Sequence, residues 1–589
     1  MSALISSREH VDHNKALNIP IYTHTHPRIL GRHISSVYVT LYPKTISKMN
    51  PVTLFSFVAS TFVLMTSPLA MANDDIASWC KKFTPFPQEC ESYARSYSVS
   101  QPPPIKGFPD FFKLALRSAF TTAATVTKNA YSLGPNLKDP KEKAAWADCV
   151  ELYELALHHL NKTISPVTKH TNEDAQTWIS SALTYYETCK DGFSDLALAN
   201  SPILPLVAND DVSHLISNAL AINKKNGVSN VTNDEPVLPA GFKKLVHGGG
   251  EGGGWPSWLR PGDRKLLQKS NLLATWVNLV VAQDGSGDYT TVSEAVAAAT
   301  KRSGNGRFVI HIRAGTYREN VVIGSGVENV MLLGDGIGQT IITGSRSVGG
   351  GSTTFRSATV SAKGPGFIAQ GITFRNTAGP LNHQAVALLS ASDRSVFYQC
   401  NFEGYQDTLY VFSNRQFYRD CNIYGTVDFI FGNAAVVIQN CNIFAHFPPA
   451  TTNTLTAQGR TDPNQNTGII IHRCRVAPAL DLIYKIAEVN TYLGRPWKAY
   501  SRTVYMETVL HDLINPAGWM PWNGDFALDT LYYAEYRNTG PGSYTAKRVN
   551  WPGYHIIKTA AVASKFTVAN FIAGDSWLPA IRVPFIAGL

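Results

Sequence analysis

The chain has 589 residues, of which 44% are hydrophobic, so it is long enough for two or three domains that each bury a core. Its net charge of +9 and its pI near 8.9 favour polyanionic partners, namely nucleic acid, anionic membrane or acidic polysaccharide. No run of Arg and Lys with interleaved aromatic residues is present, which argues against nucleic acid and favours an acidic polysaccharide.

The N-terminal residues predict export from the cell. Residues 1–48 are polar and show no clear pattern, whereas residues 52–70 are mostly apolar, follow two lysines and end in the small-x-small sequence AMA (70–72). This layout predicts a signal peptide over residues 49–72, preceded by the extension 1–48, and therefore secretion. The alternative is a signal anchor in a membrane, although the apolar core is short for a span of about 20 residues.

From residue 73 to about residue 230, apolar residues recur at helical spacing. Two stripes step by three and four residues: Trp146, Cys149, Tyr153, Ala156 and Leu160, then Ala175, Trp178, Ala182, Tyr185 and Cys189. Such stripes are the buried faces of packed helices. With further helices expected at about 109–132 and 213–224, the region 73–230 is predicted to be an all-α four-helix bundle.

Four cysteines lie in this helical region. After a signal peptide an even number of cysteines indicates disulfides, and the positions favour Cys80–Cys90 and Cys149–Cys189. Sequons at Asn161 and Asn230 are compatible with N-glycosylation on a secretory route, although such short motifs also occur by chance.

Residues 231–271 lose the helical periodicity and are predicted to form a linker. They contain HGGGEGGG (247–254), whose composition is typical of a flexible chain. The basic sequence Arg264-Lys265-Leu266-Leu267 follows. Its position between two domains makes it a candidate site of proteolytic processing, and the alternative is an ordinary solvated basic patch.

Residues 272–589 show strand patterns instead. Strands are expected at 308–312, 330–333, 340–343 and 372–374, a short helix at 292–299 that covers the end of the fold, and loops that wall a cleft at 447–467 and 477–493. The phrases CNF (400–402), CNI (421–423) and CNI (441–443) recur at a nearly constant step of about 20 residues. This period, without helical spacing, predicts the coils of a parallel β-solenoid, in which equivalent residues stack at roughly 4.8 Å.

The repeat brings polar residues to one wall of the solenoid. Gln384 precedes Gln406 by about one period, Asp407 follows at once, and Asp428 comes one period after Asp407. Bulky apolar neighbours surround both acids, and such neighbours desolvate a carboxylate and raise its pKa. The alternative is a structural ladder of polar side chains at strand ends, but the stacked set favours a catalytic site.

The repeat also stacks three cysteines on consecutive coils. Roughly 5 Å between their Cα atoms is within the range that a disulfide accepts. We predict a Cys421–Cys441 bridge rather than Cys400–Cys421, because the first pair flanks the coil that holds Asp428.

The sequence contains no Gly-x-Ser-x-Gly elbow, and its histidines, cysteines and acids are not clustered at metal-ligand spacing. A hydrolase built from these residues would therefore use a carboxylate nucleophile. We predict no metal and no other cofactor.

Four phrases carry a family resemblance: QAVAL (384–388), GYQDTLY (404–410), TVDFIFGNA (426–434) and LGRPWK (493–498). Together they resemble the plant pectin methylesterases, from about residue 279 to the C-terminus. The resemblance implies a right-handed parallel β-helix that hydrolyses the methyl esters of homogalacturonan pectin, releases methanol and modifies the cell wall. Leu389 and Ala499 depart from the family, which usually has Arg and Glu at these positions.

The resemblance also implies roles. Asp428 would be the nucleophile, and Asp407 would donate a proton to the departing methanol and then act as the base for water. Gln406 and Gln384 would stabilise the oxyanion. Arg495 would pair with Asp428 and orient it, although a purely structural ion pair is the alternative.

Aromatic and polar residues are expected to contact the sugar chain. The set comprises Thr354, Gln384, Arg495, Trp497 and Trp519, with Trp522 as a further cleft aromatic. A core indole is the alternative for Trp497, but the exposed Gly-Arg-Pro turn before it favours contact with a sugar ring.

The helical region resembles, in its cysteine spacing, the pectin methylesterase inhibitor domain that precedes many plant enzymes, and an unrelated helical pro-domain is the alternative. The sequence 264–267 resembles the family's processing motif, which implies cleavage by a subtilisin-type protease. Methyl-esterified pectin, this protease and a proteinaceous inhibitor are the expected partners, and the cell wall, or apoplast, is the expected location.

Two other functions fit part of the pattern. A pectin-cleaving solenoid glycosidase also uses paired carboxylates but would shorten the polymer, and the two glutamines favour acyl chemistry instead. An inactive binding protein is the second alternative, and the intact set of predicted catalytic residues argues against it.

Overall fold

The computed structural model describes residues 76–99, 105, 107–208, 210–229, 277–304 and 306–589. All of them lie in the unit that spans residues 69–589. The predicted extension, signal peptide and linker, with Asn230 and the sequence 264–267, lie outside the described residues. Within the described ranges, no helix is both long and apolar enough to cross a bilayer.

The helices expected from the sequence are present. The bundle is made of α3 (Phe108–Leu133), α4 (Pro140–Ile164), α5 (Asn172–Asp195) and α7 (Asp210–Ser229), with the shorter α2 (Pro87–Val99) and α6 (Leu204–Val207) beside them. Their apolar stripes pack into one core, in which Cys149, Tyr153 and Leu160 are fully buried. The predicted four-helix bundle is confirmed.

Local caps fix where the two central helices begin. The side chain of Asp139 accepts the N–H of Lys141 at 2.7 Å before α4, and Thr171 and Asp174 form a reciprocal capping box at the start of α5. The predicted disulfides Cys80–Cys90 and Cys149–Cys189 are both formed. The second bridge joins α4 to α5.

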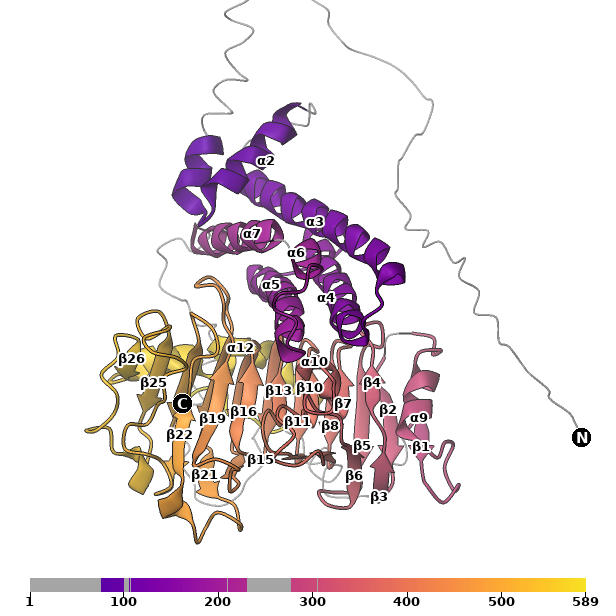
Figure 1. Cartoon of the computed structure of the whole chain (residues 1–589), viewed down its shortest axis with the longest axis vertical. Coiled ribbons are helices and arrows are strands. Elements are labelled where there is room, and N and C mark those ends of the chain that lie inside the picture. The colour runs from indigo at the N-terminus through magenta and orange to yellow at the C-terminus, as the bar shows by residue number, and fades with distance from the viewer. Residues whose placement is uncertain (1–75, 100–104, 106, 209, 230–276, 305) are drawn as a thin grey trace, which may run out of the picture. The chain divides into compact units, whose positions relative to one another are not determined.

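The remainder of the chain is a parallel β-helix built of three sheets, in which each strand pairs with the equivalent strand of the next coil (Figure 1). The 11-stranded sheet contains β1 (Leu279–Val281), β2 (Phe308–Ile312), β5 (Val330–Gly334), β8 (Ile368–Gln370), β11 (Ser395–Tyr398), β14 (Arg415–Arg419), β17 (Ala435–Gln439), β20 (Gly468–His472), β23 (Arg502–Met506), β25 (Tyr532–Tyr536) and β26 (Tyr554–Ile556).

The other two sheets complete each coil. The 7-stranded sheet contains β4 (Val321–Ile323), β7 (Val360–Ala362), β10 (Leu388–Ser390), β13 (Leu409–Val411), β16 (Val427–Gly432), β19 (Thr452–Gln458) and β22 (Asn490–Gly494). The 8-stranded sheet contains β3 (Gly315–Arg318), β6 (Thr340–Gly344), β9 (Thr373–Asn376), β12 (Asn401–Glu403), β15 (Asn422–Gly425), β18 (Asn442–Ala445), β21 (Arg475–Pro478) and β24 (Val509–Leu510).

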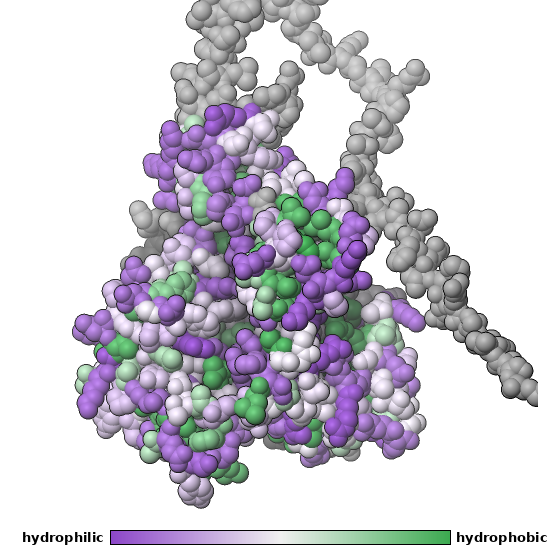
Figure 2. All heavy atoms as spheres, viewed as in Figure 1, coloured by the Kyte–Doolittle hydropathy of each residue, from purple (hydrophilic) through white to green (hydrophobic). Residues whose placement is uncertain are grey.

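The inside of the solenoid is apolar. Residues such as Ile310, Phe402, Ile423 and Ile443 are fully buried in one continuous core. Where Figure 2 displays the surface of the β-helix, apolar residues are scattered among polar ones, as expected when alternate residues of each strand point inward. The helix α9 (Val292–Ala299) packs its buried side chains onto this core, as predicted for a helix that covers the end of a solenoid.

The structure corrects both expected loops, and residues 477–493 contain most of the strand β22. Residues 447–467 were expected to form a loop, but they contain the strand β19. Excursions on both sides of β19 lengthen its coil, so that Cys474 follows Cys441 by 33 residues, a longer step than in the earlier coils. The period that identified those coils is lost there, and the strand is polar and rich in threonine.

The predicted Cys421–Cys441 disulfide is wrong. Cys400, Cys421, Cys441 and Cys474 are all buried and unbridged, and the N–H of Cys421 contacts the Sγ of Cys441 at 3.3 Å. Equivalent residues of neighbouring coils point in the same direction, so the thiols lie above one another instead of converging. A disulfide requires Cβ atoms that approach to about 3.8 Å, closer than the strand spacing allows.

Candidate active site

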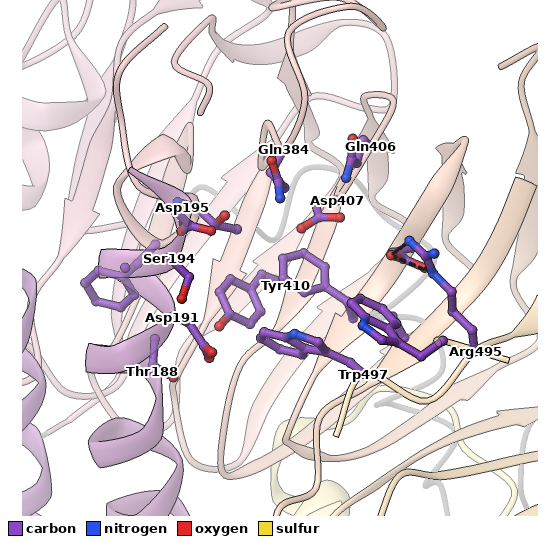
Figure 3. Close-up of a pocket in the computed structure, with 17 residues that line it drawn as sticks. Thr188, Asp191, Ser194, Asp195, Gln384, Gln406, Asp407, Tyr410, Arg495 and Trp497 are labelled. Carbon is purple, nitrogen blue, oxygen red and sulfur yellow. Dashed lines mark hydrogen bonds and ion pairs between the residues drawn. The ribbon is translucent and has the colours of Figure 1, made fainter. Parts of the chain in front are cut away.

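The polar ladder lies on the sheet that contains β10, β13 and β16. Leu409 of β13 pairs in parallel with Leu388 of β10 on one side and with Ile430 of β16 on the other, which places Asp407 one coil from Asp428. The N–H of Asp407 donates to the carbonyl of Val427 at 3.1 Å and joins the two coils at this point. Gln384 and Gln406 lie side by side next to Asp407 (Figure 3).

The backbone projects both acids out of the sheet. Asp407 has φ 61° and Asp428 has φ 53°, the left-handed region in which a residue with a Cβ atom carries a cost of roughly 1–2 kcal/mol. The register between β16 and β19 also shifts between Val427 and Ile430, so β16 bulges where it carries Asp428. Strained backbone that is held in place by its surroundings is typical of functional sites.

Asp428 is held from two sides. Arg495 donates from Nε to Oδ1 at 2.9 Å and from Nη2 to Oδ2 at 2.6 Å, which is a two-pronged pairing. Thr454 on β19 donates its hydroxyl to Oδ1 at 2.6 Å and accepts the N–H of Asp428 at 2.9 Å. The carboxylate is therefore fixed in one orientation, with 4% of the residue exposed.

Asp407 has a different environment. Burial raises the pKa of its carboxyl well above the ordinary range, and the nearby charges of Asp428 and Asp195 raise it further, while Arg495 opposes the shift. Asp407 therefore keeps a proton at a pH at which an exposed carboxyl has lost it. Asp407 can thus donate a proton, whereas Asp428, one coil away, is held by the guanidinium of Arg495.

The acids open into a cavity of about 240 Å³. The cavity is lined by the predicted residues Thr354, Gln384, Gln406, Arg495 and Trp497 and also by Tyr410, Phe431, Ala457 and Trp522. The aromatic side chains give it an apolar wall, and the acids and amides give it a polar one. This combination suits a ligand that presents a sugar face and a carboxyl group.

The expected contact of Trp519 with substrate is wrong. Trp519 is 1% exposed and stacks on Tyr533 inside the solenoid, with ring centroids 4.2 Å apart. Of the two indoles it is Trp522 that lines the cavity; it is 37% exposed, and its ring centroid lies 4.3 Å from the guanidinium of Arg495. The two indoles are three positions apart, and the chain turns only one of them outward.

Comparisons with known proteins agree with this geometry. Residues 278–575 match the pectinesterase family, and residues 74–222 match the plant invertase/pectin methylesterase inhibitor family. The chain is 56% identical over 529 residues to pectinesterase 2 of Citrus sinensis, an alignment that spans 90% of this chain and 98% of the relative. The chain belongs to the pectinesterase family.

Two further relatives support the assignment. Probable pectinesterase/pectinesterase inhibitor 17 of Arabidopsis thaliana is 53% identical over 536 residues, which cover 91% of this chain and 99% of that one. The solved structure of pectin methylesterase from carrot is 58% identical, with a TM-score of 0.53, and covers 53% of this chain and 98% of the carrot chain. The pectinesterase part is thus the β-helix, and the inhibitor-like part is the helical bundle.

Several residues of this pectinesterase site were not expected from the sequence. Thr454 was missed because its strand falls in a predicted loop. Thr188, Asp191, Ser194 and Asp195 also line the cavity, and all four belong to α5 of the helical bundle (Figure 3). The helical stripe that identified α5 marks buried apolar positions and includes none of these four polar residues, so it gave no signal for them.

The two departures from the family lie away from the acids. Leu389 is fully buried in an apolar cluster with Phe355 and Phe412, and Ala499 is partly exposed beyond Lys498. Neither residue lines the cavity.

Proposed function

We propose that this chain hydrolyses the methyl esters of homogalacturonan pectin, releasing methanol and leaving galacturonate carboxylates in the polymer. The observation that carries the proposal is the pair of acids one coil apart, of which Asp428 is clamped by Arg495 and Asp407 is buried and carries a proton. The family of the chain agrees with an ester hydrolase rather than with a glycosidase or an inactive binding protein.

In the first step, an oxygen of the Asp428 carboxylate attacks the C6 carbonyl of a methyl-esterified galacturonate. The negative charge that develops on the carbonyl oxygen is met by amide N–H groups of Gln406 and Gln384, a contribution of about 3 kcal/mol for one well-placed donor. The C–O bond to the methoxy group breaks, and Asp407 gives its proton to the leaving oxygen. Methanol departs, and an anhydride joins the uronate to Asp428.

In the second step, Asp407 is a carboxylate and accepts a proton from an incoming water molecule. The resulting hydroxide attacks the uronate carbonyl of the anhydride, and the bond to Asp428 breaks. The products are a galacturonic acid group, which releases its proton to solvent, a regenerated Asp428 carboxylate and a protonated Asp407. Each acid therefore returns to its starting state.

The wall of the cavity would hold the sugar chain. Trp497 lies at the edge of the aromatic cluster formed with Tyr410 and Phe431, with centroid separations of 6.5 and 5.9 Å, and offers a ring face to a pyranose. Thr354 and Trp522 line the same cavity and are assigned the neighbouring sugar positions.

We further propose that the chain is secreted to the cell wall and that a subtilisin-type protease removes the helical domain at residues 264–267. Asn161 is exposed on α4, which is compatible with glycosylation on that route. A basic net charge of +9 suits an enzyme that acts on a polyanionic wall polymer.

Two products measured together test the proposed activity. Methyl-esterified pectin is incubated with the chain cleaved in its linker, and both methanol and new reducing ends are quantified. Methanol release without new reducing ends is the expected result. New reducing ends would identify a glycosidase, and the absence of both products would contradict any hydrolytic role.

A further inference from the structure

The β-helix carries a second groove on the side formed by its 8-stranded sheet. The groove has a volume of about 520 Å³ and is lined by residues of β9, β12 and β15 and of the turns after β9, β12 and β18. Five of its lining residues, Arg375, Glu403, Tyr405, Tyr424 and His446, define what we call the second groove. Among the described residues, none of the helical bundle lines it, in contrast to the cavity at the acids.

Aromatic rings form one part of the second groove. Tyr424 stacks on Phe444 with ring centroids 4.8 Å apart, and the ring of His446 lies 5.6 Å from that of Tyr424 and 5.4 Å from that of Tyr405. The register of the coils places the first two rings together, because Tyr424 of β15 pairs with Phe444 of β18. Tyr405, Tyr424 and His446 are partly exposed, so ring surface is available to the apolar face of a sugar.

Polar groups without a partner lie beside these rings. Glu403 accepts Nε of Arg375 and the amide of Asn401, so its carboxylate is fixed. Among the described residues, the two terminal nitrogens of Arg375 and the hydroxyls of Tyr405 and Tyr424 form no hydrogen bond. A planar guanidinium and two hydroxyls can therefore bind the hydroxyl and carbonyl oxygens of a ligand.

The charges of the second groove cancel. Arg375 is paired with Glu403, and Nδ1 of His446 lies 3.0 Å from both oxygens of Asp481. The groove thus has no excess positive charge, although the chain as a whole carries a net charge of +9. A row of free carboxylates would find no unpaired cation there and would meet the carboxylate of Glu403, whereas a neutral sugar would not.

The second groove adjoins the active site through the turn between β12 and β13. Tyr405 lines the groove, and the next residue, Gln406, lies beside Asp407 at the active site (Figure 3). Asn376 also lines the groove, and its amide donates at 3.1 Å to the carbonyl of Val386, just after Gln384. One long polymer chain can therefore contact both sites.

We propose that the second groove binds a neutral, methyl-esterified stretch of the same pectin chain that the active site hydrolyses. The identity of the polymer rests on the proposed function. A methyl ester is uncharged, so an esterified stretch suits a groove whose own charges cancel, with sugar faces on the rings and hydroxyls on the free donors. Hydrolysis turns such a stretch into carboxylates, which the groove does not favour. The groove thereby keeps the enzyme on polymer that has not yet reacted.

The binding test uses the full chain with Asp428→Asn, so that the esters are not consumed. Into this parent we introduce Tyr424→Ala, Tyr424→Phe, Arg375→Lys or Tyr544→Ala. Tyr424→Phe keeps the ring face, and Arg375→Lys keeps a cation beside Glu403 but removes the free guanidinium nitrogens. Tyr544 is 77% exposed and does not line the groove, so its replacement is the matched control for loss of a surface tyrosine.

Calorimetry at physiological salt measures the affinity of each form for highly methyl-esterified pectin and for polygalacturonate. Tyr424→Ala should weaken binding of the esterified pectin about tenfold, and Arg375→Lys should weaken it about fivefold. Tyr424→Phe and Tyr544→Ala should stay close to the parent. Binding of polygalacturonate, which the basic surface supports without the groove, should change less than about twofold in every form.

Kinetics of the chain cleaved in its linker, with Asp428 intact, link the groove to activity. Tyr424→Ala should raise KM for esterified pectin about fivefold at an unchanged kcat, because a polymer held at two sites has a higher effective concentration at the active site. A methyl-esterified trimer is too short to contact both sites, so its kinetic constants should be those of the wild type. Melting temperatures are recorded for all forms, and Arg375→Lys gives the answer should Tyr424→Ala unfold.

Equal affinity of all forms for esterified pectin would overturn the proposal, as would an unchanged KM for the polymer. An equal loss of affinity for polygalacturonate would overturn the assignment of a neutral ligand, and an equal loss in Tyr544→Ala would show that binding does not depend on the groove. If esterified pectin binds through Tyr424 but the wild type releases no methanol, the proposed activity is contradicted and the second groove stands as a polysaccharide site.

Discussion

Thr454 and Arg495 approach the carboxylate of Asp428 from different coils and leave it one orientation. The threonine is 1% exposed, and its hydroxyl both donates to the carboxylate and accepts the N–H of Asp428 across the bulge in β16. A nucleophile that must meet a carbonyl carbon at about 3 Å loses rate when its rotamer is free. We therefore regard Thr454 as a positioning residue for Asp428.

Replacement of Thr454 by valine keeps the shape of the side chain and removes the hydroxyl. We expect kcat to fall about tenfold or more with little change in KM, because the lost bond orients the nucleophile and does not bind sugar. Thr454→Ser should restore most of the rate, since it restores the hydroxyl. Steady-state kinetics on the cleaved chain measure both constants, and a change confined to KM would assign Thr454 to sugar binding instead.

A second prediction concerns Gln406, whose side chain lines the cavity beside Asp407. Gln406→Ala removes an amide that is proposed to donate to the oxyanion, an interaction that strengthens only as charge develops. Loss of such a donor costs about 100-fold or more in kcat. Kinetics of methanol release measure the effect, and an unchanged kcat with a raised KM would show that Gln406 contacts the sugar ring only.

At the scale of elements, the β-helix and the bundle use cysteine in opposite ways. Cys400, Cys421, Cys441 and Cys474 stack unbridged on consecutive coils, whereas Cys149–Cys189 joins α4 to α5. Alkylation in denaturant without reductant should therefore label the four solenoid thiols and leave the four bundle cysteines unlabelled. Labelling of Cys400 and Cys474 alone would contradict this expectation and would show that Cys421 and Cys441 form a disulfide.

The disulfide between α4 and α5 supports the element that enters the cleft. It closes a separation of 40 residues, for which chain entropy predicts a contribution of about 4 kcal/mol to the stability of the bundle. Replacing both Cys149 and Cys189 by alanine should lower the melting temperature of the helical part. The double substitution should also speed hydrogen exchange in the peptides that contain Thr354 and Lys498, which α5 contacts. Unchanged protection of these peptides would show that α5 is held by its other contacts alone.

At the scale of the whole molecule, docking of the helical domain is linked to pH. The pKa of Asp195 is raised from 3.8 to about 6, mainly by burial; the hydrogen bonds from Thr354 oppose the shift, and the charges of Asp191 and Asp148 add to it. Asp195 also raises the pKa of Asp407 across the cleft. Because the docked pKa is the higher one, the protonated carboxyl favours docking.

The raised pKa of Asp195 predicts that docking of the helical domain weakens as the pH rises. The contribution of Asp195 to docking is complete below about pH 4 and is lost as pH rises through about 6, a weakening of up to about 100-fold for two pKa units. The affinity between the two parts of the chain cleaved in its linker, measured by calorimetry, should therefore weaken between about pH 5 and 7. Asp195→Asn, which cannot titrate, should flatten this dependence, and an affinity that is constant in the wild type would contradict the linkage.

Much of the fold and of the site could be predicted because a solenoid repeats. A nearly constant step along the chain placed Asp407 over Asp428, and helical periodicity placed the bundle and the Cys149–Cys189 bridge. The repeat indicates the position of a residue along a coil but not the direction of its side chain. The predicted contact of Trp519 with the substrate and the predicted Cys421–Cys441 bridge both depended on that direction, and both were wrong. The contacts of α5 with the cleft join segments that are far apart in the sequence. They produce no periodic pattern near either segment, so the sequence could not predict them.

The central claim is that Asp428 is the nucleophile of a pectin methylesterase, and its amide variant tests that claim most directly. Asp428→Asn keeps the size of the side chain, and its remaining oxygen can accept from Thr454 and from Nε of Arg495, while the bond from Nη2 is lost, so the fold should be retained. Methanol release by the purified chain, cleaved in its linker, should fall at least about 1,000-fold. Turnover near that of the wild type, in a variant with an unchanged melting temperature, would contradict the account.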